Sequence, residues 1–239
     1  MKWRPKIAGS VVCALVLLCA GCSSTPRISP ENEKIIRNYW GLYFENSPEW
    51  EDAKTKWLAM GEAEKKCLVN LLILDIFNRA VRPSLDAAGN PEPGWTRSKN
   101  ELISLGNLAL EPRLNALNRL TDKTVALPYI EALAAIASVS DIEAAFDESS
   151  QDRVAYHSRL VKVLIRLDDP RATKQILKVL KESKDWQVRA TAATVLMGYQ
   201  GPQFSEVRNA LELALRDEDP FVAEKAKASL NALMERQSK

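Results

Sequence analysis

Two segments near the C-terminus carry one pattern of apolar residues, displaced by 34 positions. The corresponding residues are Val188 and Val222, Ala192 and Ala226, and Leu196 and Leu230. A spacing of four residues places such side chains on one face of an α-helix. A short helical unit cannot bury this face alone, so repeated units stack and bury a continuous core. The repeat therefore predicts stacked helix pairs.

The composition favours helices throughout the chain. Glycine accounts for only 9 of the 239 residues, and long runs are rich in Ala, Leu, Glu and Lys. These four residues are strong helix formers. No segment shows the clear alternation of apolar and polar residues that is typical of a β-strand. We therefore expect an all-α fold, and more specifically an α-solenoid of stacked antiparallel helix pairs.

Each copy of the repeat follows an acidic turn. The two motifs are Asp185-Trp-Gln-Val-Arg-Ala-Thr-Ala-Ala-Thr-Val-Leu196 and Asp219-Pro-Phe-Val-Ala-Glu-Lys-Ala-Lys-Ala-Ser-Leu230, and a weaker copy starts at Asp152. They resemble the HEAT family of helical repeats, in which an Asp caps the second helix and Ala lets paired helices approach closely. The resemblance implies that Arg189 contributes to a ladder of Asp–Arg contacts between units. The last copy has Ala223 at this position, as expected of a terminal unit.

A second repeat, with an offset of 45 residues, lies nearer the N-terminus, on either side of a loop at 83–94. This loop contains three prolines and two glycines, which exclude a continuous helix. The corresponding residues are Trp50 and Trp95, Trp57 and Leu102, Met60 and Leu105, Gly61 and Gly106, and Leu71-Leu72 and Ala116-Leu117. Each copy predicts a helix, a glycine turn and a second helix, unless two unrelated helix pairs coincide. We expect N-terminal helical repeats over 30–120 and C-terminal HEAT-like repeats over 121–239.

The first 24 residues have the layout of a secretory signal. A head with three cationic residues precedes the apolar run Ile7–Leu18, and the small pair Ala20-Gly21 stands directly before Cys22. A membrane-spanning helix needs about 20 apolar residues, so this run is too short to cross. The segment resembles a bacterial lipoprotein signal. The resemblance implies that residues 1–21 are a signal peptide and that Cys22 becomes a lipidated N-terminus, a candidate for palmitate attachment.

The residues that follow indicate where the protein is held. Residues 22–29 are expected to form a short lipidated tether, and Ser29 with Pro30 to start the first helix. In the lipoprotein family an Asp after the modified Cys usually marks retention in the inner membrane. Ser23 at this position therefore implies an anchor in the outer membrane of the cell envelope, facing the periplasm.

Two alternatives to lipidation stay open at this stage. The residue three positions before Cys22 is Cys19, whereas the lipoprotein family prefers Leu or another aliphatic residue there. Ordinary cleavage after Gly21 would release a soluble periplasmic protein. The other alternative is a cytosolic protein with an apolar N-terminal helix, although nothing gives that run a polar face.

Removing the signal changes the charge of the chain. The full sequence has 33 cationic and 31 acidic residues. The three charges before Cys22 are all basic, which leaves 30 cationic against 31 acidic residues and a formal net charge of −1. Such a chain lacks the basic footprint of proteins that bind nucleic acid. We therefore expect no nucleic-acid partner.

Few residues of the sequence are suited to catalysis or metal binding. Outside the signal and Cys22 there is one thiol, Cys67, and one histidine, His157, and both are expected to be packing residues. No Gly-rich phosphate loop or Gly-x-Ser-x-Gly motif is present. Acidic clusters at 141–148 and 217–219 lack the ligand spacing of a Ca²⁺ loop and predict helix caps and solvated turns. We expect no catalytic residue, no cofactor and no metal site.

Aromatic residues gather near the N-terminus of the expected helical region. They are Tyr39, Trp40, Tyr43, Phe44, Trp50 and Trp57. One interpretation is a hydrophobic plug that closes the first turn of the solenoid. The other is an exposed aromatic face for a partner protein or for the membrane near the anchor.

These observations favour a protein that binds and positions others and is not an enzyme. We expect a lipid-anchored scaffold or adaptor of the cell envelope, held at the membrane through acylated Cys22, whose helical surface binds another envelope protein. The sequence does not identify the protein-binding residues. The alternatives are a soluble periplasmic HEAT-like protein, a purely structural envelope component, and a lyase-like enzyme or enzyme subunit, since some HEAT-like proteins are bilin lyases or their partners.

Overall fold

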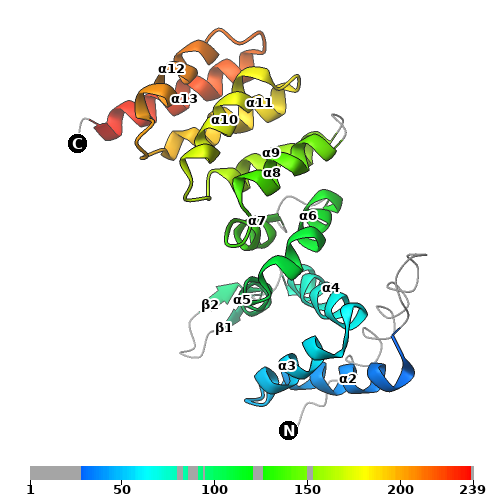
Figure 1. Cartoon of the computed structure of the whole chain (residues 1–239). Helices are drawn as coiled ribbons and strands as arrows, with labels where there is room; N and C mark the ends of the chain where they lie inside the picture. The colour runs from blue at the N-terminus through cyan, green and yellow to red at the C-terminus, as the bar shows by residue number, and fades with distance from the viewer. Residues whose placement is uncertain are drawn as a thin grey trace. The chain divides into compact units, whose positions relative to one another are not determined.

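Figure 1 shows the computed structural model, which describes residues 28–79, 83–85, 91–93, 95–120, 126–149 and 153–237. The expected signal at 1–21, Cys22, most of the tether and part of the loop at 83–94 lie outside these residues. The chain divides into two compact units, Met1–Asp75 and Ile76–Lys239. The predicted division into 30–120 and 121–239 stays a prediction.

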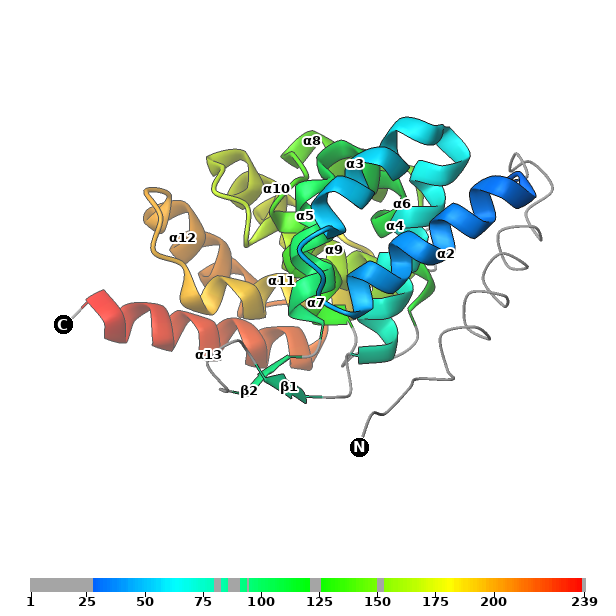
Figure 2. The ribbon, with the colours of Figure 1, turned by 90° about the horizontal axis from the view of Figure 1, so that it is seen from below.

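The first unit is built from three helices, α2 (Pro30–Phe44), α3 (Trp50–Met60) and α4 (Glu62–Arg79), of which α4 continues into the second unit. Helix α2 begins where the sequence predicts, because the Ser29 side chain accepts a hydrogen bond from the Asn32 backbone N–H at 3.1 Å. Helices α2 and α3 pack against each other (Figure 2).

The second unit continues from α4 with a short hairpin that the sequence analysis did not predict. Strand β1 (Pro83–Leu85) pairs antiparallel with β2 (Pro91–Pro93), with Pro83 opposite Pro93. Proline has no N–H to donate to a ladder and is tolerated in strands only at an edge, and a two-stranded hairpin consists of edges alone. Apart from this hairpin the described residues form helices and their connections, and the prediction of an all-α fold is confirmed.

Nine α-helices and two 3₁₀ turns follow the hairpin in the described part of this unit. They are α5 (Thr96–Ser104), η1 (Gly106–Ala109), α6 (Leu110–Arg119), α7 (Ala126–Ala134), α8 (Val139–Glu148), α9 (Val154–Leu164), α10 (Pro170–Glu182), α11 (Trp186–Val195), η2 (Leu196–Gly198), α12 (Phe204–Ala214) and α13 (Pro220–Gln237).

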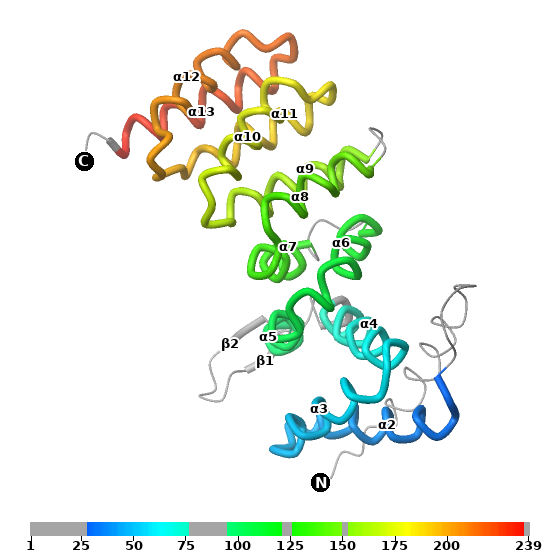
Figure 3. Tube along the Cα trace, in the orientation of Figure 1, coloured from blue at the N-terminus to red at the C-terminus, as the bar shows by residue number. Residues whose placement is uncertain are grey.

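The helices from α8 onward form two rows. Helix α11 packs between α9 and α13, while α10 packs between α8 and α12. Within each pair the two helices also touch, α8 with α9, α10 with α11 and α12 with α13. The trace in Figure 3 follows this path from pair to pair. Because connections of few residues join the members of each pair, the two helices run antiparallel, which is the solenoid-like stacking that the repeat predicts.

The residues of the 34-residue repeat lie in the core of this stack. Of the six, all but one are buried, with at most 1% of each buried residue exposed. Leu230 is the exception and is only half-buried, while Leu233 is buried on the same helix. The same spacing therefore places Leu196, in η2, inside the core and Leu230, in α13, at its edge.

The 45-residue repeat also forms helices at the expected places. Trp50 begins α3, and Trp95 lies directly before α5. Gly61 separates α3 from α4, while Gly106 begins the 3₁₀ turn before α6 with a φ of 54°. Since this positive φ is costly for other residues, a glycine is required at Gly106.

Candidate functional site

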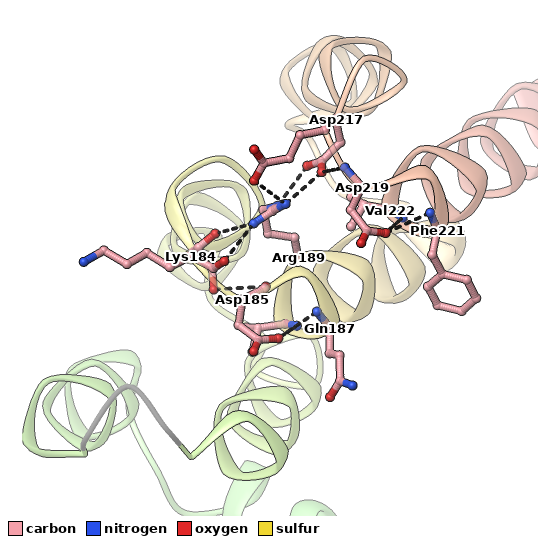
Figure 4. A network of polar contacts seen from close by, with 11 residues as sticks. Lys184, Asp185, Gln187, Arg189, Asp217, Asp219, Phe221 and Val222 are labelled. Carbon is pink, nitrogen blue, oxygen red and sulfur yellow. Dashed lines mark hydrogen bonds and ion pairs between the residues drawn. The ribbon is translucent and has the colours of Figure 1, made fainter.

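Arg189 is the centre of the polar network that the structure places at one edge of the second unit (Figure 4). Its Nε donates to Oδ2 of Asp217 at 2.9 Å, and its Nη2 donates to Oδ1 of the same carboxylate at 2.8 Å. The two side chains are only 7% and 11% exposed. This two-point geometry is the strongest form of an arginine–carboxylate pair. It links helix α11 to the turn before α13.

The same guanidinium also binds the end of helix α10. Its Nη1 donates to the backbone carbonyls of Ser183 at 2.9 Å and Lys184 at 3.2 Å. Carbonyls at a helix C-terminus have no partner within the helix and carry partial negative charge, so a cation there is stabilising. Arg189 therefore joins two successive helix pairs.

The charges of this pair stabilise each other. The hydrogen bonds between the two side chains raise the pKa of Arg189 and lower the pKa of Asp217 from their ordinary values, against the opposing effect of burial. Both groups are therefore charged over a wide pH range. Glu218, at 3.3 Å from the same guanidinium, is 86% exposed and adds little.

The acidic turns serve as helix caps, as predicted. Oδ1 of Asp185 accepts from the backbone N–H groups of Gln187 at 2.7 Å and Val188 at 3.4 Å. Asp219 makes the equivalent contacts with Phe221 and Val222 at 2.9 and 3.4 Å. In both copies of the repeat, the capping Asp therefore stands directly before the helix that carries the buried apolar residues.

Two aromatic rings lie exposed beside these caps. Trp186 and Phe221 occupy the first turns of α11 and α13, with 40% and 43% of each residue exposed. Their ring centroids are 5.6 Å apart in an edge-to-face arrangement, and Nζ of Lys225 lies 4.4 Å from the centroid of the Phe221 ring. The sequence analysis did not predict this pair. The sequence offered one indication of it, because in each copy an aromatic residue follows the capping Asp within two positions.

The acidic cluster at 141–148 begins with another cap. Ser138 and Asp141 form a reciprocal capping box at the start of α8, in which each side chain accepts from the other residue's backbone N–H at 3.2 and 2.7 Å. Asp147 and Glu148 are exposed at the far end of the same helix. These positions match the predicted roles as cap and solvated surface.

His157 is half-buried on α9 and packs against Phe146, with ring centroids 5.2 Å apart. Its Nε2 lies 2.5 Å from Oγ of Ser149, a contact that the sequence analysis missed because Ser149 lies eight positions earlier and outside α9. Burial lowers the pKa of His157, while the nearby charge of Asp185 opposes this shift. The ring is therefore neutral at neutral pH and suits the predicted packing role.

Two buried arginines also escaped the sequence analysis. Arg113, on α6, is fully buried, and its Nη1 donates to the carbonyl of Ala132 near the end of α7 at 3.0 Å. Burial lowers the pKa of Arg113 to about 10. Arg159, on α9, donates from Nη1 to the carbonyls of Leu117 at 2.9 Å and Leu120 at 2.7 Å, where α6 ends. With Arg189, three arginines bind carbonyls at the ends of neighbouring helices.

The N-terminal aromatic residues form a packed cluster in the first unit, which favours the plug over the exposed face. Trp40, Tyr43, Trp50 and Trp57 are at most 3% exposed, whereas Phe44 is 45% exposed. Trp40 stacks on Tyr43 with ring centroids 4.7 Å apart. The indole N–H of Trp57 donates to the Glu64 carbonyl at 2.7 Å, which satisfies its one polar atom.

Cys67 is buried, in keeping with its expected packing role. Cys22, the expected lipidation site, lies outside the described residues. Among the residues that the structure describes, no group of three or more His, Cys, Asp or Glu side chains is placed to hold a metal ion. Over the same part of the chain, none of the helices combines the length and the apolar character that crossing a membrane requires.

Comparison of the sequence with protein-family models and with curated proteins gives no match. The arguments on function therefore rest on the sequence and on the geometry above. The strongest candidate for a functional surface is the edge at the starts of α11 and α13, because polar and aromatic groups of two successive helix pairs meet there. Figure 4 shows the polar contacts of this edge together with the Phe221 ring.

Proposed function

We propose that this protein is a lipid-anchored scaffold or adaptor of the bacterial cell envelope, built on HEAT-like repeats, that binds another envelope protein. The observation that carries the proposal is the position of Cys22, directly after a charged head, a short apolar run and two small residues. Acyl chains on this residue would hold the protein at a membrane surface, with the outer membrane as the expected location. Confinement there raises its effective concentration toward envelope partners.

The stacked helix pairs support the binding half of the proposal. Solenoids present extended surfaces, because each unit contacts only its neighbours and adds its own turns to a common edge. In this chain the edge exposes Trp186 and Phe221, and Trp in particular is enriched among the residues that dominate binding at protein interfaces. Trp186 is held at the edge by the start of a capped helix.

The anchor is tested with the full chain and a Cys22→Ser variant, labelled in cells with an alkyne-bearing palmitate and followed by envelope fractionation. We expect the wild type to carry the label and to fractionate with membranes, and the variant to lose both properties. A Cys67→Ala variant is the matched control. It should keep the label, because Cys22 is unchanged in it and the Cys67 thiol of the wild type is buried. Equal behaviour of wild type and Cys22→Ser, without label, would contradict lipidation and favour a soluble periplasmic protein.

A further inference from the structure

The exposed side of helix α10 carries a stripe of cations. Its members are Arg171, Lys174, Lys178 and Lys181, which follow one another at intervals of three or four residues. This spacing places them on one face of the helix, and all four are exposed. The opposite face supplies the buried residues of α10, among them Ile176 and Leu180. The stripe is therefore an outer surface of the row that α8, α10 and α12 form.

Most of this stripe is not neutralised by the chain that carries it. Asp169 binds Arg171, with 2.7 Å between its Oδ2 and Nη2 of the guanidinium. Over the part of the chain that the structure describes, none of the three lysines takes part in an ion pair. Glu182 is the last residue of α10, and the flanking turns add one exposed charge of each sign, Asp168 and Lys184. The three lysines are therefore the uncompensated part of the stripe.

The neighbouring helix α8 carries the opposite charge. Its carboxylates are those of Asp141, Glu143, Asp147 and Glu148, and its sequence contains no cationic residue. Asp141 is used in the capping box, and Glu148 is the last residue of the helix. Glu143 and Asp147 lie one helical turn apart, and neither forms an ion pair with another described residue. Helix α8 thus presents an acidic pair with the spacing of the basic pair Lys174 and Lys178.

The acidic and basic pairs belong to adjacent helices, since α8 packs against α10. The hydrogen bond with Asp169 raises the pKa of Arg171, and the charge of Glu143 adds to this shift. Glu143 therefore lies close to the start of α10. We call the surface made by Glu143, Asp147, Lys174 and Lys178 the charged face.

A flat membrane of anionic lipids does not match this row of helices. Helix α12 adds Glu206, Arg208 and Glu212, and the three helices together carry five cationic and seven acidic residues. Anionic lipids attract surfaces with an excess of Lys and Arg, which this row lacks. A matching occupant instead has an acidic stripe for α10 and, beside it, a basic stripe for α8. A second copy of the same chain has both stripes at the same separation.

We propose that the charged face is the interface of a symmetric dimer, in which α8 of each copy lies against α10 of the other. A two-fold axis that runs between the two helices, along their length, produces this arrangement, and each contact then occurs twice. Glu143 and Asp147 of one copy meet Lys174 and Lys178 of the other. Exposed ion pairs are weak and are screened by salt, so the dimer is salt-sensitive. The inference does not depend on the anchor.

Sedimentation velocity of the purified full chain in non-ionic detergent measures the dimer. We expect dimers at about 0.1 M NaCl and monomers at about 1 M, where the Debye length has fallen from about 10 to about 3 Å. The double variants Lys174→Glu/Lys178→Glu and Glu143→Lys/Asp147→Lys should each weaken dimerisation at least tenfold, by about one order of magnitude or more. Lys227→Glu, at an exposed position of α13 in the other row, is the control and should leave the dimer unchanged. Circular dichroism verifies that each variant is folded.

A mixture of the two double variants tests the two-fold geometry. Each variant has two stripes of like charge and repels its own copies, whereas the mixture again brings acidic stripes against basic ones. We expect the mixture to form a dimer that neither variant forms alone. A wild type that stays monomeric at low salt, double variants that dimerise as well as the wild type, or a mixture that does not associate would each overturn the proposal.

Co-sedimentation with phosphatidylglycerol vesicles tests a lipid surface as the occupant. We expect Lys174→Glu/Lys178→Glu to bind these vesicles as the wild type does. A monomeric wild type whose vesicle binding is lost in this variant would overturn the dimer and favour a lipid surface. Loss of the anchor in Cys22→Ser has no bearing on the charged face, so an unlipidated chain that still dimerises would contradict the proposed function alone.

Discussion

At the scale of single residues, the second unit contains polar side-chain atoms that are buried without a hydrogen-bond partner. In the described residues, the buried side-chain atoms that lack a hydrogen bond are Nε and Nη2 of Arg113 and Oγ of Ser229. A buried donor or acceptor without a partner costs about 1–3 kcal/mol, which is a large fraction of a domain's stability. Both residues lie in helices whose other buried positions are mostly apolar.

Ser229→Ala should stabilise the protein. The Ser229 side chain is fully buried on α13 and its hydroxyl has no partner, so its removal relieves a desolvation cost and adds a better helix former. We expect the free energy of unfolding to rise by about 1 kcal/mol. Urea denaturation followed by circular dichroism measures it. Ser205→Ala, at an exposed position of α12, is the control, and a lower midpoint for Ser229→Ala than for the wild type would contradict the prediction.

Arg113→Met should also raise stability. The guanidinium is fully buried with one hydrogen bond, and its depressed pKa of about 10 shows that burial disfavours its charge. Replacing a buried charge by an apolar side chain of similar volume is neutral or stabilising by about 1–4 kcal/mol. The thermal midpoint of the variant should exceed that of the wild type and of Arg119→Met, an exposed control on the same helix. A midpoint below both would show that the Arg113–Ala132 contact outweighs the burial cost.

At the scale of helices, arginine contacts hold neighbouring elements together. Arg159 and Arg189 each bind carbonyls where a neighbouring helix ends, and Arg189 adds a carboxylate from the next turn. Such ends carry unpaired carbonyls, so one side chain stabilises a helix terminus and sets the position of the adjacent helix. The helix pairs of the second unit are thus joined by polar contacts at their ends as well as by the apolar core.

Asp217→Asn should destabilise the second unit, because it leaves the nearly buried Arg189 without its carboxylate. We expect a loss of about 2–4 kcal/mol in the free energy of unfolding. Glu218→Gln is the matched control, since its side chain is 86% exposed and makes only the longer contact, and it should change stability by less than about 0.5 kcal/mol. Equal effects of the two variants in urea denaturation would show that the two-point contact contributes nothing specific.

The same pair predicts a dependence on pH. The pKa of Asp217 is lowered in the folded protein, so its contribution is present above the pKa of about 3.9 for an Asp in the unfolded chain. The contribution is lost as the pH falls from there through the folded-state pKa, because protons then bind the folded state as well. Wild type and Asp217→Asn should therefore converge in stability toward acid pH. A constant difference down to pH 2 would contradict this assignment.

At the scale of the whole molecule, α12 and α13 form the last helix pair of the residues that the structure describes. The exposed surface of α12 is mainly polar, with an ion pair of 2.7 Å between Arg208 and Glu212. A polar face of this kind is compatible with contact with water. The same helix pair carries Ala223 at the position equivalent to Arg189.

The sequence by itself determined the helical architecture and the capped, buried repeat positions. Helix periodicity and capping depend on residues three or four positions apart, so Asp185, Asp219 and the residues 34 apart could be read from the printed chain. Only the tertiary structure decided which distant groups meet. The contact of Arg189 with Asp217, the burial of Arg113 and the ring contact of Trp186 with Phe221 depend on how helix pairs stack, which local spacing does not encode.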